Sequence, residues 1–151
     1  VEILISIILV GLSITALVFA SNSFTMANGA GSDLSTAEFL VEQIREMTML
    51  LPVRDPDVDT WTTLGPNGES GVTNYDDVDD FDGATCSPPI DALGNPLNDL
   101  AAFSQTVTVD WVSQSNFNQI STSATPFIRV TVQVALNGRE ICSASWVRAD
   151  Y

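Results

Sequence analysis

The chain has 151 residues and a formal net charge of −14, from 19 acidic residues against five arginines. It contains neither histidine nor lysine, which excludes imidazole-activated nucleophiles, histidine metal ligands, the usual phosphate-binding P-loop and a Schiff-base lysine. The acidity would repel nucleic acid, so no such partner is expected, and the length allows one small domain beside the apolar start.

The first twenty residues form an apolar run whose only charge is Glu2. As a helix, residues 3–20 would measure about 27 Å at about 1.5 Å per residue, which is enough to cross a bilayer. We therefore expect a membrane anchor. Glu2 is unusual there, because a carboxylate at the edge of hydrocarbon is costly without a partner. The alternative is a glutamate whose head lies in water at the membrane interface.

A second helical pattern follows a short polar stretch. Ser35 and Glu38 form a capping-box pattern. Apolar or small residues then recur at intervals of three and four, which predicts an amphipathic helix: Ala37, Leu40, Val41, Ile44, Met47, Thr48 and Leu51. Pro52 ends the pattern. The simplest geometry is one long helix over about 1–51, kinked or loosened near 29–31, where two glycines occur.

Residues 53–100 have the composition of a loop, rich in Asp, Gly, Pro, Asn and Thr. Within them, WTTL at 61–64 is a candidate short strand. A structureless loop of this length is unusual in a compact domain. We expect it to be pinned by local packing, by a cysteine bridge or by a neighbouring subunit.

The chain has two cysteines, Cys86 and Cys142. In a chain anchored in a membrane with its domain outside the cell, an isolated pair favours a disulfide over a redox or metal site. Closing the long loop between them would stabilise the fold by about 4 kcal/mol through loop-closure entropy.

The last third, 103–151, has the pattern of an antiparallel sheet. Polar and apolar residues alternate in FSQTVTVDWV at 103–112 and in FIRVTVQVAL at 127–136. One face of each strand should therefore be apolar, made by Phe103, Val107, Val109 and Trp111 in the first strand and by Ile128, Val130, Val132, Val134 and Leu136 in the second. Asn137 and Gly138 then give a strong hairpin signal.

A two-residue turn at this hairpin fixes an expected register. Val134 would oppose Ile141, Gln133 would oppose Cys142, and Arg129 would oppose Trp146. The Val/Ile face would then cover the helix around Leu40, Ile44 and Met47. Cys142 would point away from the helix and could tether the acidic loop through Cys86 across the outer surface of the sheet.

Five carboxylates within seven positions form a candidate calcium site of oxygen ligands: Asp76, Asp77, Asp79, Asp80 and Asp82. Their spacing does not match an EF-hand, because Phe81 and Pro88 stand where ligands are required. The alternative is a solvated acidic loop.

Trp61, Trp111 and Trp146 could line a carbohydrate-binding face, or they could pack in the core. Paired carboxylates can hydrolyse glycosides, but nothing in their local setting indicates raised acidity. We expect a protein that is not an enzyme.

Taken together, these features resemble the type IV pilin and pseudopilin family. VEILI at 1–5 is similar to the start of the family's mature chains, as if three leading residues were absent, and Gly11 falls where the family commonly has a helix glycine. Among its members, YDDVDDFDG at 75–83, the strand ending in DWV and FIRVTVQVALNG look most like minor subunits of mannose-sensitive haemagglutinin pili.

The resemblance implies an α+β fold, in which a long N-terminal helix packs on a small antiparallel sheet. Residues 1–28 would form the membrane anchor and filament core, and 29–151 a globular head. Within the head we expect an amphipathic helix at 33–51, an acidic loop at 53–100 and the sheet at 103–151.

The resemblance also implies a function. The chain would be a structural subunit of a pilus, held in the bacterial inner membrane before assembly and then extracellular. Its partners would be copies of itself in a helical homopolymer, other pilins and the inner-membrane assembly machinery. Glu2 would pair with the free amino terminus of a neighbouring subunit. Gly11 would be a point of helix unwinding or of a tight helix crossing.

Two alternatives remain. One is a pseudopilin of a type II secretion system, in a short periplasmic filament. The other is a membrane-anchored domain that binds sugar or calcium. No cofactor is expected apart from calcium as a candidate.

Overall fold

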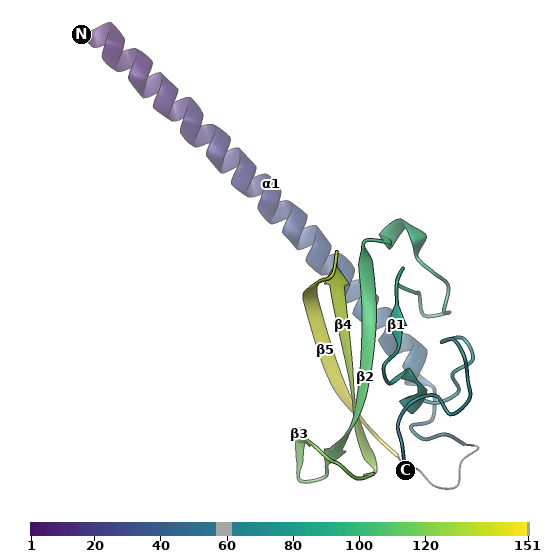
Figure 1. The fold of residues 1–151 in the computed structure, drawn as a ribbon. Helices are drawn as coiled ribbons and strands as arrows, with labels where there is room; N and C mark the ends of the chain where they lie inside the picture. Colours follow the sequence, from purple (N-terminus) through teal and green to yellow (C-terminus); the bar gives the residue numbers. More distant parts are fainter. Residues whose placement is uncertain (57–61, 151) are drawn as a thin grey trace. The chain divides into compact units, whose positions relative to one another are not determined.

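The structure is a computed structural model that describes residues 1–56 and 62–150. The chain divides into two compact units, Val1–Ser35 and Thr36–Tyr151. One long helix, α1 (Glu2–Met49), begins in the first unit and ends in the second, where it packs on a small antiparallel β-sheet (Figure 1). The predicted α+β class is confirmed.

α1 is helical at every position, including Gly29 and Gly31. The expected loosening there is therefore absent, and Ser35 lies inside the helix rather than capping a new one. Each glycine costs about 1 kcal/mol relative to alanine, but extending a helix avoids the unfavourable nucleation that a second helix would need.

In the second unit, α1 buries the predicted face. Ala37, Leu40, Val41, Ile44 and Thr48 are buried, and the two other predicted positions are partly buried against the same core. The helix ends shortly before Pro52, as expected. The amphipathic pattern is confirmed in this part of the chain.

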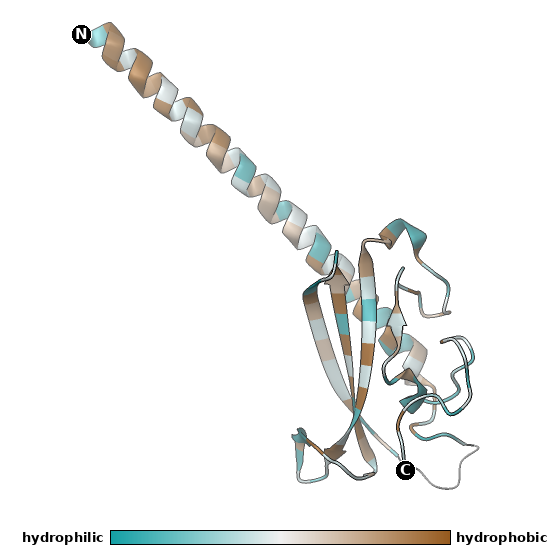
Figure 2. Ribbon diagram, viewed as in Figure 1, coloured by the Kyte–Doolittle hydropathy of each residue, from teal (hydrophilic) through white to brown (hydrophobic). Residues whose placement is uncertain are grey.

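The sheet has the strand order β1-β2-β4-β5, with β3 paired to the end of β2. Its strands are β1 (Thr85–Cys86), β2 (Phe103–Ser113), β3 (Asn116–Ile120), β4 (Phe127–Leu136) and β5 (Arg139–Ala149). Hydropathy alternates along β2 and β4 in Figure 2, and the apolar side of each is buried. The two long predicted strands are confirmed, whereas β3 was not predicted.

Two further predictions concern short segments. Asn137 and Gly138 have φ values of 51° and 78°, as a two-residue hairpin turn with positive φ at both positions requires. The candidate strand at 61–64 is wrong for 62–64, which have no strand structure, and Trp61 lies outside the described residues.

A β-bulge changes the register of β4 and β5 three residues after the turn. Ala135 pairs with Glu140 but Val134 pairs with Cys142, so Ile141 is the extra residue. The predicted pairing of Val134 with Ile141 is therefore wrong, and so are the pairings that followed from it. Because side chains alternate between the two faces, one extra residue moves every later β5 side chain to the opposite face.

The bulge brings the end of β5 onto α1. Trp146 pairs with Val130 rather than with Arg129, and the Arg45 guanidinium lies 5.6 Å from the centre of the Trp146 ring. Arg148 donates hydrogen bonds to the backbone carbonyl oxygens of Thr48 and Leu51. Thr48 lies in the last turn of α1, where its carbonyl oxygen also accepts the N–H of Leu51 at 3.4 Å, and Leu51 lies just beyond the helix, so Arg148 caps this helix end.

The two cysteines do not form the predicted disulfide, and both are free. Cys86 pairs with Gln105, Gln105 with Val134, and Val134 with Cys142, so the cysteines stand at opposite ends of one row across the sheet. Three strand spacings separate their Cα atoms by about 14 Å, whereas a disulfide needs about 4.4–6.8 Å. The row faces the core, so Cys142 points inward rather than outward.

Local packing holds the loop at 53–100 in place, which is one of the three explanations that the sequence left open. The backbone N–H of Val78 donates to the carbonyl oxygen of Pro52 at 3.0 Å. Gln105 accepts from the N–H of Ile90 at 2.7 Å and donates to the carbonyl oxygen of Leu40 at 2.8 Å. A single buried glutamine thus links the sheet, the loop and the helix.

Candidate functional site

The first unit presents an uncovered apolar helix. Its large hydrophobic side chains, from Val1 to Met26, are between 52% and 97% exposed. By length and composition α1 could cross a membrane, and none of its most apolar window is buried. Figure 2 shows the hydrophobic colour concentrated along this half of α1. Such a surface needs a cover of lipid or of protein.

The hydroxyl groups of this apolar stretch are satisfied within the helix. Ser6, Ser13 and Thr15 each donate to the backbone carbonyl oxygen four residues earlier, at 2.8–2.9 Å. Unsatisfied hydroxyls would be costly in hydrocarbon. These serines and threonine are therefore compatible with lipid and with a dry contact between helices.

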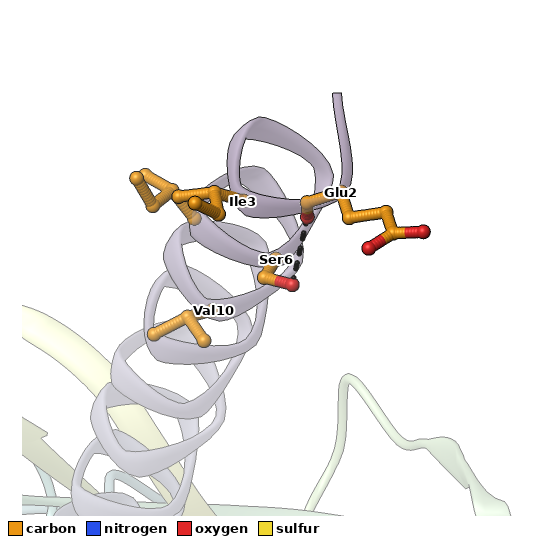
Figure 3. Close-up of a pocket in the computed structure, with 5 residues that line it drawn as sticks. Glu2, Ile3, Ser6 and Val10 are labelled. Carbon is orange, nitrogen blue, oxygen red and sulfur yellow. Dashed lines mark hydrogen bonds between the residues drawn. The ribbon is translucent and has the colours of Figure 1, made fainter.

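Glu2 is the one charged side chain in this apolar stretch. It lines a shallow groove on the helix surface together with Ile3, Ser6, Ile7 and Val10. Figure 3 shows its carboxylate extending away from the helix, while the dashed hydrogen bond runs from the Ser6 hydroxyl to the Glu2 backbone oxygen. Within the described residues the Glu2 carboxylate has no ion pair. A partner would have to come from outside them.

Gly11, the second predicted assembly residue, is open on all sides. A Cβ added to it would meet nothing within 4 Å, beyond the helix's own backbone. Neither a helix crossing nor unwinding occurs at Gly11 in the described chain, where the position is helical. Both interpretations would concern an assembled state.

The second candidate site is the acidic stretch at 76–82. The alternative of a solvated loop is wrong for three of its five carboxylates: Asp77 and Asp79 are 0% exposed, and Asp80 is 1% exposed. They lie in and beside the short 3-10 helix η1 (Asp79–Phe81). Asp76 is exposed and Asp82 is half-buried.

Backbone hydrogen bonds explain part of this burial. Oδ1 of Asp77 accepts from the N–H groups of Asp79 (2.7 Å) and Asp80 (3.1 Å). Oδ1 of Asp82 accepts from the N–H of Val109 at 2.9 Å and so ties the loop to β2. Asp82 therefore has its own structural role, because its carboxylate binds the backbone of β2.

The structure brings an additional carboxylate into the group. Carboxylate oxygens of Asp55, Asp76 and Asp77 all lie within 4.8 Å of one another. Asp55 is buried at 6% exposure and also accepts from the Asn67 amide at 3.3 Å. Sequence reasoning missed Asp55, because about twenty residues separate it from the others and no local spacing connects them.

Burial perturbs the acidity of this group. It raises the pKa of Asp77 to about 8, with the adjacent Asp79 carboxyl as the second cause. It also raises the pKa of Asp80 to about 6, helped by the negative charge of Asp77. Burial and the neighbouring carboxylates therefore disfavour the charged forms of Asp77 and Asp80.

Two of the three predicted tryptophans lie within the described residues. Trp111 and Trp146 are partly buried and pack against the hydrophobic core. For these two residues, core packing accounts for the side chains better than a carbohydrate surface does.

No protein-family model, curated protein or solved structure matches this chain. The resemblance to type IV pilins therefore stays a prediction that rests on the sequence pattern, and the fold agrees with it in class.

Proposed function

We propose that this chain is a structural subunit of a type IV pilus-like filament, which polymerises through the apolar half of α1. The observation that carries the proposal is the helix surface up to Met26, which is apolar and at least half exposed. Lipid covers it before assembly, and copies of the same helix cover it afterwards.

Glu2 gives the transfer from lipid to filament its selectivity. A carboxylate at the edge of hydrocarbon is destabilised unless a positive charge lies near it, and low-dielectric surroundings strengthen the attraction to that charge. By the family resemblance, the positive charge is the amino terminus of a neighbouring subunit. The carboxylate extends away from the helix in Figure 3 and has no ion pair within the described residues, which is compatible with such a partner.

The test is filament assembly by Glu2→Ala and Glu2→Gln variants. Both substitutions remove the charge, and the second keeps the size of the side chain. Filaments are sheared from the cells, separated from membranes and quantified by immunoblot and electron microscopy. We expect both variants to reach the membrane at the wild-type level and to lose most of their filaments.

Glu46→Ala is the matched control. Glu46 lies on the same helix but in the second unit, and its side chain is exposed. Wild-type assembly by Glu2→Ala would contradict the charge-pairing mechanism. Failure to find this chain in any sheared long fibre would contradict the pilus proposal, and finding it only in short periplasmic filaments would favour the secretion pseudopilin.

A further inference from the structure

A second site lies in the loop that joins α1 to the sheet, apart from the assembly surface. Here Asp55, Asp76 and Asp77 each direct one carboxylate oxygen to within 4.8 Å of the other two. Oxygen ligands lie about 2.3–2.6 Å from a bound Ca²⁺ ion, so two oxygens on one ion are at most about 5 Å apart. The spacing of these three oxygens therefore fits one shared cation.

An independent observation shows that the group needs a ligand. Asp77 is 0% exposed, and within the described chain its Oδ2 has no hydrogen-bond partner. The buried Oδ1 of Asp80 has none either. Most buried polar atoms in native proteins are paired, and an unpaired buried carboxylate is costly. Either a proton or a cation must hold these oxygens.

The surroundings favour a cation over a proton. Further carboxylates surround Asp77 and Asp80: Asp79 lies beside Asp77, and Glu69 and Asp76 act on Asp80. Neither Asp77 nor Asp80 takes part in an ion pair with a described arginine. One shared proton would neutralise one charge, whereas a divalent cation compensates two.

The ligand chemistry selects calcium. The chain has no histidine, and the three oxygens come from carboxylates, which suit hard cations. Ca²⁺ accepts six to eight oxygens in irregular arrangements, whereas Mg²⁺ demands a near-ideal octahedron. Asp76 is exposed, which gives the ion a route from solvent and leaves room for water ligands.

We propose that Asp55, Asp76 and Asp77 bind one calcium ion and that this ion fastens the loop after α1 to the segment before η1. The two segments already touch through the hydrogen bond from the N–H of Val78 to the oxygen of Pro52. The ion adds a second link beside it. This site does not depend on how the chain assembles.

The test measures thermal unfolding and calorimetric binding of the full chain in detergent micelles, after removal of metal with a chelator. We expect added CaCl₂ to raise the melting temperature by several degrees, because a ligand that binds the folded state stabilises it. MgCl₂ at the same concentration should give a smaller rise. No rise with calcium would overturn the proposal.

Three variants locate the site. Asp76→Asn and Asp77→Asn should each weaken calcium binding by about tenfold or more, since each removes a charged ligand. Asp99→Asn makes the same charge change at an exposed position of η2 (Asn98–Leu100) and should bind like wild type. Equal calcium responses in wild type, Asp76→Asn and Asp77→Asn would place any binding elsewhere and overturn the assignment.

The calcium-free proteins provide a check on folding. In Asp77→Asn the amide oxygen can still accept from the N–H groups of Asp79 and Asp80, while the buried charge is gone. Its melting temperature without calcium should therefore equal or exceed that of wild type. If Asp77→Asn does not fold, calcium binding by the Asp76→Asn variant decides the outcome, because Asp76 is exposed.

Discussion

At the scale of single residues, the acidic stretch shows how far burial can depart from side-chain type. Aspartate is usually exposed, and a run of five predicts a solvated loop. In the structure the short carboxylate of Asp77 instead accepts two backbone N–H groups. Because Oδ1 of Asp77 accepts these hydrogen bonds inside the protein, Oδ2 of the same carboxylate is buried as well. No rule of spacing predicts that second consequence.

Buried acids also predict the pH dependence of stability in the calcium-free chain. The pKa of Asp77 is raised from 3.8 to about 8 and that of Asp80 from 3.8 to about 6. Burial is the first cause of both, and Asp79, Asp76 and Glu69 are the charged groups around them. At these two groups the folded state thus holds more protons than the unfolded state, so their contribution to stability is greatest at low pH and is lost as pH rises toward 8.

The measurement is chemical unfolding in metal-free buffer between about pH 5 and pH 8.5. We expect the free energy of unfolding to fall across this window in wild type and to fall less in Asp77→Asn. A wild-type profile that is flat or rises with pH would show that Asp77 is ionised at little cost. Asp99→Asn serves again as the control of equal charge.

At the scale of elements, alternation was enough to predict β2 and β4, and the Asn-Gly turn was enough to predict the hairpin that joins β4 to β5. They could not predict the bulge at Ile141. Along β5 the apolar residues divide between both faces: Cys142, Ala144 and Trp146 on one, Ile141 and Val147 on the other. The pattern therefore does not choose a register, and contacts with α1 decide it. Asp55 could not be predicted either, because it is the fold of the loop, and not a local sequence pattern, that brings it close to Asp76.

The strand order gives a prediction about thiols. Because the rows of the sheet hold Cys86 and Cys142 about 14 Å apart, the purified chain should carry two free thiols without any reductant. Alkylation of the unfolded, unreduced protein should add two labels by mass spectrometry. The Cys142→Ser variant should accept one label. If the wild-type chain accepts no label, its two cysteines form a disulfide and the prediction is wrong.

In the native state this labelling should be slow. Burial raises the pKa of both thiols, so little thiolate is present at neutral pH. Cys142 is half-buried whereas Cys86 is buried, and we expect Cys142 to react first.

At the scale of the whole molecule, the two units are built for different surroundings. The second unit closes its own core with α1 and the sheet. The first unit exposes its apolar side chains and satisfies its hydroxyl groups within the helix. A helix that is apolar all round cannot bury its own surface and needs a cover of lipid or protein.

Gly11 tests whether copies of the first unit meet closely. A methyl group added there meets nothing within 4 Å in the chain, so Gly11→Ala and Gly11→Leu should leave the monomer folded. If helices cross tightly at this point, filament yield should fall as the side chain grows. Gly29→Leu is the control, since Gly29 is equally open but lies beyond residues 1–28. Wild-type yield from Gly11→Leu would exclude a close crossing at Gly11.

The hydrogen bonds from Arg148 to the end of α1 have a consequence for the order of folding. They join residues 100 and 97 positions apart in sequence, and contacts of such separation form late because the intervening chain must first be closed into a loop. β5 supplies both this contact and the outer strand over the helix. An emerging chain therefore leaves Arg45, Thr48 and Leu51 without their contacts until β5 has joined the sheet. Proteases and chaperones can distinguish unfinished copies from finished ones during that interval.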